Sequence, residues 1–191
     1  FKKAAAAEGM TIRAWVDKTL NAAADGKLSA GSRGSGGADA KALSEMSAKL
    51  DEKTGTITIH RDGLAKPVVT QNAAADHRPY LHPITGPDGK GVFTQYSPGH
   101  HKHQTGIYWG FTRVNGRDYF HNPKGDYWKR KDVKVLEARG ESVKWETVYD
   151  LLDADGNAVL TEKQRWSMTS ENDRHVLNLE WMGTGQTDVT V

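Results

Sequence analysis

Three of the eight histidines in this 191-residue chain lie within four positions, at His100, His101 and His103. Residues two apart in an extended strand project to the same side, so we expect His101 and His103 to share a face and His100 to point away. A His-x-His pair is half of a common zinc, copper or iron site, because two neutral imidazoles converge on one ion. A divalent metal is therefore one alternative. The candidates for its third ligand are His82, His121 and Asp118.

The same histidines also suit acid–base chemistry that needs no metal. An imidazole in a cleft donates a proton to a leaving or ring oxygen, while a carboxylate on the other side accepts one. The candidate acids are His82, His101 and His103. The candidate bases are Asp118, Glu146, Glu162 and Glu180. For the three glutamates a solvated strand face is the simpler interpretation.

Other side chains near the histidines could hold a ligand. Arg78 carries a planar guanidinium that suits an anionic or polyhydroxyl group. Several aromatic rings could stack on sugar faces, namely Tyr80, Tyr108, Trp109, Tyr127 and Trp128. Alternating aromatic residues also build the core and rims of any β-sandwich, so core packing remains the alternative for each ring.

Composition excludes several classes of protein. The chain has no cysteine, which excludes disulfides, a thiolate metal site and a cysteine nucleophile. It has neither a Gly-x-Ser-x-Gly elbow nor a phosphate-binding loop between a strand and a helix. A net charge of +2, without a basic patch interleaved with aromatic residues, argues against nucleic-acid binding. No apolar run approaches the roughly 20 residues that a membrane-spanning helix needs.

The N-terminal part of the sequence has a helical period. Apolar residues at i, i+3, i+4 and i+8 predict a helix over residues 11–24, so residues 1–30 are a helical tail or the end of a preceding domain. Residues 31–52 are predicted to form a Gly/Ser-rich linker and a short helix. The spacing of Leu43, Met46 and Leu50 predicts that helix, and we place the domain boundary near Lys53.

From Thr54 onward the period of the apolar residues changes from 3.6 to 2, which predicts strands. Turn sequences separate them, including Pro87-Asp88-Gly89 and Asn115-Gly116. Strand candidates include KPVVTQ, RPYLHPI, GVFTQY and TGIYWGFTRV, followed by four longer ones after residue 131. Strands without intervening helices predict an antiparallel sandwich or barrel over residues 53–191. The final TDVTV is expected to be a strand cut off within the sheet, which would make the domain incomplete.

Residues 76–123 contain an ordered series of short motifs that resembles a bacterial family known as PmoA-like. The motifs are the box RPYLHP, the His-rich run SPGHHKHQTG, the aromatic IYWGF and the turn NGRD. The resemblance covers residues 54–191. It implies an antiparallel β-sandwich similar to the mutarotase-like supersandwich, and it maps the family motifs onto a set of residues. These are Arg78, His82, His100, His101, His103, Asn115 and Asp118.

The resemblance also implies a function and a location. PmoA-like proteins are exported bacterial proteins, so a periplasmic or secreted location is expected. The leading hypothesis is a carbohydrate-active or carbohydrate-binding domain with a His- and Arg-lined cleft. Its catalytic residues would be His82, His101 and His103, with a carbohydrate or other small polar ligand as partner. The alternatives are a metal-dependent oxygenase or hydrolase using His101 and His103, and a non-catalytic binding or structural module.

Overall fold

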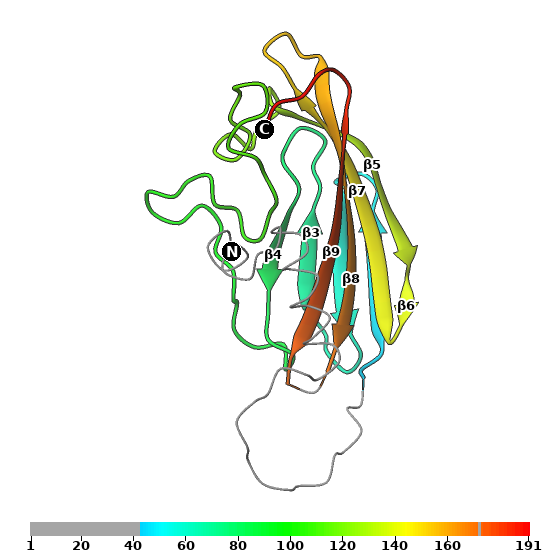
Figure 1. Cartoon of the computed structure of the whole chain (residues 1–191). Helices are drawn as coiled ribbons and strands as arrows, with labels where there is room; N and C mark the ends of the chain where they lie inside the picture. Colours follow the sequence, from blue (N-terminus) through cyan, green and yellow to red (C-terminus); the bar gives the residue numbers. More distant parts are fainter. Residues whose placement is uncertain (1–42, 172) are drawn as a thin grey trace, which may run out of the picture. The chain divides into compact units, whose positions relative to one another are not determined.

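The computed structural model describes residues 43–171 and 173–191, and the regular secondary structure of these residues is entirely β (Figure 1). The predicted N-terminal helix and Gly/Ser linker lie outside the described residues. The strands are β1 (Met46–Asp51), β2 (Thr56–Arg61), β3 (Val69–Asn72), β4 (Tyr80–Ile84), β5 (Trp128–Glu137), β6 (Arg139–Gly140), β7 (Ser142–Leu152), β8 (Ala158–Ser170) and β9 (His175–Gly185). The part of the chain that the structure describes contains no helix that could span a membrane.

The strands form two antiparallel sheets, as the alternating sequence pattern predicted. One sheet has the strand order β4-β3-β2-β1-β6, and the other has the order β5-β7-β8-β9. The longest hairpin joins β7 to β8 through the turn at Asp153–Asn157. There the Asp153 carboxylate accepts the backbone N–H groups of Asp155 and Asn157. This turn fixes the register of the two central strands of the four-stranded sheet.

The two sheets share one buried core. Ile57, Ile59 and Leu81 of the five-stranded sheet pack in the same cluster as Trp145 and Trp166 of the four-stranded sheet. A polar contact crosses this core, because the Trp145 indole donates to the side-chain oxygen of Gln71 at 3.0 Å. Burial of each large apolar side chain contributes about 1.5–3 kcal/mol. The sheets are therefore held face to face mainly by apolar packing.

A long connection between β4 and β5, residues 85–127, covers another part of the four-stranded sheet. We call it the covering segment. It contains no regular strand. Isolated bridges such as Leu81↔Ile107 and single hydrogen bonds, such as that from the Tyr119 hydroxyl to the Leu152 carbonyl, connect it to its neighbours. Its buried Val114 and Tyr119 pack with Tyr149 and Leu160 of β7 and β8 in a second core cluster. In Figure 1 the segment appears in green as loops beside β4.

Two predictions for the start of the domain are wrong. Residues 46–51 form strand β1 rather than a short helix, and β1 pairs with β2 on one side and β6 on the other. The boundary near Lys53 is wrong for the same reason, since β1 belongs to the sheet. Met46 and Leu50 fit a helical spacing, but Met46, Ala48 and Leu50 also alternate with period 2. Pairing with strands distant in sequence selects the second pattern.

Three segments that the sequence predicted to be strands are described by the structure but do not form strands. GVFTQY and TGIYWGFTRV lie in the irregular covering segment, and the final TDVTV is not a strand. The Asn115-Gly116 turn is confirmed, with positive φ at both residues and a bridge between Val114 and Arg117. The backbone of this turn contacts the end of the chain, where the Asn115 N–H donates to the Thr190 carbonyl at 2.9 Å.

Candidate functional site

The covering segment is rich in histidine and poor in acidic residues. Residues 85–127 contain four of the eight histidines and five of the 26 Lys and Arg residues, but only three of the 24 acidic residues. Ring contacts run along it, from Tyr108 to Phe120 at 5.2 Å, from Phe120 to His103 at 5.6 Å, and from His103 to His121 at 4.5 Å between centroids. These side chains form the candidate site.

Arg78 holds this surface together from beneath. Its side chain is fully buried, and its guanidinium donates to the backbone carbonyls of His103 (2.8 Å), Phe120 and Tyr119 (3.4 Å). The planar fork therefore joins two loops of the covering segment that lie about 16 residues apart in the sequence. The sequence predicted that Arg78 contacts a ligand, whereas the structure directs its N–H groups to loop carbonyls.

The Arg78 guanidinium also makes a cation–π contact with an aromatic ring. Its guanidinium carbon lies 3.4 Å from the centroid of the Tyr108 ring, which is a close cation–π contact. Burial lowers the pKa of Arg78 to about 10, although Tyr108, Glu162 and Asp118 partly oppose this effect. Arg78 consequently stays charged at neutral pH. Tyr108 is thereby fixed on the Arg78 plane, and we assign it a supporting role.

The His-rich run is a compact turn rather than a strand, so the predicted separation of its side chains is wrong. The His101 N–H donates to the Pro98 carbonyl, and the Gln104 N–H donates to the His101 carbonyl. The rings of His100 and His101 lie 4.0 Å apart, while those of His101 and His103 are 6.1 Å apart. His100 therefore faces His101 instead of pointing away from it.

The shortest contact between ionisable groups in the covering segment joins His121 and Asp118. His121 Nδ1 lies 2.7 Å from Asp118 Oδ2, while Asp118 Oδ1 accepts the backbone N–H groups of Phe120 and His121. Burial alone would raise the pKa of Asp118, but the hydrogen bonds from His121 and Phe120 outweigh it and lower that pKa. The carboxylate thus orients the His121 ring and leaves Nε2 directed away from the pair.

His121 was considered only as a metal ligand in the sequence, and its pairing with Asp118 was missed. The available signal was the Asp-x-x-His spacing in RDYFHNP, since an Asp that caps a tight turn faces a side chain three residues later. The neighbouring His103 has a lowered pKa, because its ring is partly desolvated and lies close to His121 and Arg78. The lowered pKa favours the neutral form of the His103 ring.

Two further predicted residues lie apart from this histidine group. His82 Nδ1 hydrogen-bonds Thr94 Oγ1 at 2.8 Å, and its ring packs 6.0 Å from Tyr96. Tyr80 packs 5.7 Å from the same Tyr96 ring, and burial raises the pKa of Tyr80 to about 12. Within the described residues, no ring contact or hydrogen bond links either side chain to His101 or His103.

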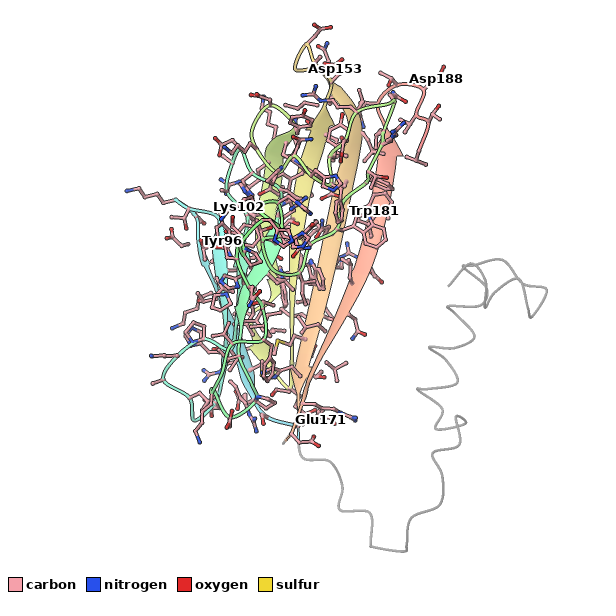
Figure 2. The ribbon with its side chains drawn as sticks, turned by 90° about the vertical axis from the view of Figure 1, so that its left-hand side faces the viewer. Tyr96, Lys102, Asp153, Glu171, Trp181 and Asp188 are labelled. Carbon is pink, nitrogen blue, oxygen red and sulfur yellow. The ribbon has the colours of Figure 1, made fainter. Side chains whose placement is uncertain are left out.

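An aromatic platform lies where the covering segment meets β9. Trp109 is 41% exposed, and its ring lies 5.8 Å from that of Trp181 on β9, with Phe111 5.3 Å from Trp181. The Trp181 indole donates to Glu162 Oε2 at 2.9 Å. Figure 2 shows Trp181 at about the same level along the strands as Lys102 in the covering segment. Trp109 thus presents an accessible ring on a fixed support.

Two glutamates predicted to lie on solvated faces are buried. Glu162 is fully buried, and burial raises its pKa to about 7 despite N–H donors from Trp181 and Gln164. Glu146 is 2% exposed on the outer face of the four-stranded sheet, where Lys134 and Arg165 pair with its carboxylate. Neither contributes to the histidine group. Glu180, with a side chain 77% exposed, matches the prediction of a solvated face.

Other predicted ring and polar residues have structural partners. Trp128 is fully buried, so the prediction that it stacks on a ligand is wrong for this ring. Tyr127 lies beneath the Arg117 guanidinium at 3.7 Å. The Asn115 side chain binds the end of the chain, since its Nδ2 donates to the Asp188 carbonyl and its Oδ1 accepts the Thr190 N–H.

The metal alternative requires three converging ligands. Among residues 43–171 and 173–191, no group of three or more His, Asp or Glu side chains has the arrangement needed to hold a metal ion. The chemistry that the grouped side chains support is acid–base exchange at the His121–Asp118 pair beside the His103 ring.

Comparison with known proteins gives a family but no described function. No curated protein and no solved structure matches this sequence. A family model described as "Family of unknown function (DUF6807)" matches residues 56–191, which includes all strands from β2 to β9 and the whole covering segment. The match extends over more than half of the sequence, and on this basis the chain belongs to the family of unknown function DUF6807.

Proposed function

We propose that this chain contains a PmoA-like, carbohydrate-binding domain of an exported bacterial protein, with a sandwich of the mutarotase-like type. The proposal is supported by the motif resemblance over residues 76–123 and by the two face-to-face antiparallel sheets. The ligand would bind on the covering segment, between the Trp109 platform and the His103–His121 group. Arg78 and Tyr108 would maintain that surface from below.

The observation that carries this proposal is the exposure of Trp109 on a fixed support. Its ring is 41% exposed, although a Trp side chain gains more from burial than any other residue of the segment. Trp181 backs it at 5.8 Å, and the hydrogen bond to Glu162 fixes Trp181. A sugar ring presents an apolar face of C–H groups and a polar edge of hydroxyls. A preorganised indole would contact the first, and the imidazoles of the His103–His121 group would contact the second.

The test is a glycan-binding screen followed by titration calorimetry with Trp109→Ala. We expect a loss of about tenfold or more in affinity, because one aromatic contact of about 1.5 kcal/mol corresponds to that factor. Leu136→Ala is the matched control, since Leu136 is also 41% exposed but lies on β5. Equal affinity of Trp109→Ala and wild type for every glycan that binds would refute the platform.

A second candidate function, acid–base catalysis on a glycan, is favoured by the His121–Asp118 pair. In this mechanism Asp118 holds the His121 ring through Nδ1 at 2.7 Å, and His121 Nε2 exchanges a proton with a sugar oxygen. The ring centroid of His103 lies 4.5 Å from that of His121. The lowered pKa of His103 favours its neutral form, so His103 would be the partner that accepts a proton. Of the three catalytic residues predicted from the sequence, His82, His101 and His103, this mechanism uses only His103. It adds His121, which the sequence had not suggested as an acid or base.

Measuring turnover and affinity for the same glycan distinguishes a catalytic domain from a domain that only binds. For an acid–base enzyme, His121→Gln is expected to lower kcat by 100-fold or more, within the range of about 10²–10⁴ that general acid–base groups contribute. The affinity for the glycan would change much less. His100→Gln serves as control, because the ring of His100 packs against that of its neighbour His101 and not against His103 or His121. Glycan binding without any turnover would leave the binding-domain proposal standing and remove this one.

A further inference from the structure

A hollow of about 390 Å³ lies in the covering segment beside the His121–Asp118 pair. Its lining includes two lysines, two histidines, one aspartate and one tyrosine, which are Lys102, Lys124, His103, His121, Asp126 and Tyr127. The volume is in the range of small-ligand sites, which are a few hundred cubic ångströms. The hollow is therefore large enough for one sugar unit.

The charges around the hollow are unbalanced. Lys102 and Lys124 are exposed, and neither has a carboxylate at salt-bridge distance among the described residues. The closest polar contact of the Lys102 ammonium is the Ser97 carbonyl at 3.5 Å. By contrast, several lysines of the four-stranded sheet are paired, such as Lys131 with Asp150 at 3.4 Å. Two ammonium groups therefore line the hollow, and neither forms a salt bridge with a carboxylate of the described residues.

The acidic groups nearby do not cancel this charge. The Asp118 carboxylate is occupied by His121 and by two backbone N–H groups. Asp88, which lies in the first half of the segment, pairs with Lys90 at 3.8 Å. Only Asp126 contributes a carboxylate to the lining itself. The remaining donors, two ammonium groups and the His103 imidazole, favour a negatively charged guest.

We propose that this hollow holds the anionic group of an acidic sugar, a uronate carboxylate or a sulfate ester, and that the domain prefers acidic over neutral glycans. The inference rests on the proposed carbohydrate-binding function and names its substrate class. Lys102 and Lys124 supply the charge, and His103 supplies a ring N–H donor, since the Nδ1 of His121 is already paired with Asp118. The contacts Tyr108–Phe120 and Phe120–His103 connect the hollow to Tyr108, which precedes Trp109 in the sequence.

A matched ligand pair tests the charge directly. Galacturonate and galactose differ only in a carboxylate at C6, and NMR follows the His103 and His121 ring signals as either sugar is added. We expect galacturonate to shift both rings and to raise the titration midpoint of His103, because a nearby anion favours the charged imidazole. Galactose is expected to leave that midpoint unchanged. The same result with both sugars would overturn the inference.

Charge removal tests the lysines. For a uronate oligosaccharide, Lys102→Gln/Lys124→Gln is expected to lose affinity by about tenfold or more, since hydrogen bonds to charged groups contribute about 1.5–3 kcal/mol each. Lys129→Gln, an exposed position on β5, is the control and should match wild type. Affinity of the double variant equal to wild type for both uronate and sulfated oligosaccharides would contradict the inference.

Three ligand classes separate this inference from the function on which it rests. If neutral oligosaccharides bind with dependence on Trp109 and acidic ones bind no more tightly, the acidic preference alone is wrong. If no oligosaccharide of any charge binds, both proposals are wrong. Tighter binding of uronate oligosaccharides, of sulfated ones or of both supports the inference, and the comparison identifies which anion the hollow accepts.

Discussion

The indole N–H of Trp181 donates to the buried carboxylate of Glu162 at 2.9 Å. The second carboxylate oxygen accepts from Gln164 at 2.7 Å, so an N–H donor occupies each oxygen. Trp181 in turn packs against exposed Trp109. A fully buried acidic group thus determines where the surface aromatic platform lies.

This burial makes the stability of the fold depend on pH. Burial raises the pKa of Glu162 to about 7, above its value of 4.5 in an unfolded chain. The folded state therefore binds this proton more tightly, and the stabilisation is fully present below pH 4.5 and lost as the pH rises through 7. From pH 4 to pH 8, we expect the free energy of unfolding of wild type to fall by about 3 kcal/mol relative to that of Glu162→Gln, at about 1.4 kcal/mol per pKa unit. Urea denaturation at both pH values measures this.

Glu180→Gln is the control for that experiment, because the Glu180 side chain is 77% exposed on the neighbouring strand β9. A difference between wild type and Glu162→Gln that stays constant from pH 4 to pH 8 would show that Glu162 does not titrate in this range. The absolute stability of the variant is not the readout, since the introduced amide replaces one acceptor oxygen with a donor.

Arg78→Lys should destabilise the covering segment. Lysine keeps the charge but lacks the planar fork, so carbonyls of His103 and Phe120 would lose their donors within the protein. We expect a loss of about 2–4 kcal/mol in the free energy of unfolding, from unsatisfied buried acceptors and the lost contact with Tyr108. Hydrogen exchange should rise most over residues 97–122. Arg113→Lys, an exposed change in the same segment, is expected to leave both measurements unaltered.

Glu146→Gln removes the charge that pairs with Lys134 and Arg165, so it should lower the free energy of unfolding at pH 7. We expect a loss of only about 1–2 kcal/mol, because both cations are partly exposed and stay solvated without their partner. Burial alone would raise the pKa of Glu146, but hydrogen bonds from Lys134 and Arg165 outweigh it and lower that pKa. Its stabilisation is therefore present above the unfolded pKa and lost as the pH falls. Denaturation curves of variant and wild type should converge as the pH falls through the lowered pKa of Glu146.

Glu137→Gln provides a comparison, since Glu137 pairs with Lys144 at 2.6 Å but is 46% exposed. Exposed pairs contribute about 0–1 kcal/mol, so its effect should be the smaller of the two. Equal losses for both variants at pH 7 would mean that the burial of Glu146 adds nothing.

Asn115→Gly should release the end of the chain without straining the turn. Asn115 has φ of 50°, which glycine adopts freely, but glycine lacks the side chain that binds Asp188 and Thr190. We expect faster hydrogen exchange at the Thr190 amide and little change in Tm. Asn115→Ala should lose about 1 kcal/mol more, from the cost of positive φ in a residue with a Cβ. An unchanged exchange rate at Thr190 in both variants would contradict this role.

Local sequence patterns predicted the strands that alternate clearly and the turns that close them. The alternation of Ile57 and Ile59 identified β2, and the Asp-Gly sequence after Asp153 marked the β7–β8 turn. The pattern failed where two periods coincide. Met46 and Leu50 fit both a helix and a strand, and only pairing with β2 and β6 selects the strand.

The candidate site was predicted in part. The covering segment contains the run from His100 to His103 that the sequence singled out, whereas His82 lies in β4. The histidine of greatest chemical interest is His121, paired with Asp118. Glu162 was assigned to a solvated face, although it shares a strand face with Trp166, four residues along, whose ring lies in the core. Whether a charged residue is buried depends on which segment packs over its strand. The alternation of apolar residues along a strand does not predict this packing.

The sequence by itself determined the β class, the antiparallel strands and the Asn115-Gly116 turn, because each depends on residues close together in the chain. Only the tertiary structure decided that Arg78 supports the site. Its carbonyl partners lie 25 to 42 residues away, and no local pattern specifies which loop returns to them. The same holds for the platform, since Trp109 meets Trp181 only after the covering segment folds onto the four-stranded sheet. Local propensities form the strands, and packing between distant segments forms the site.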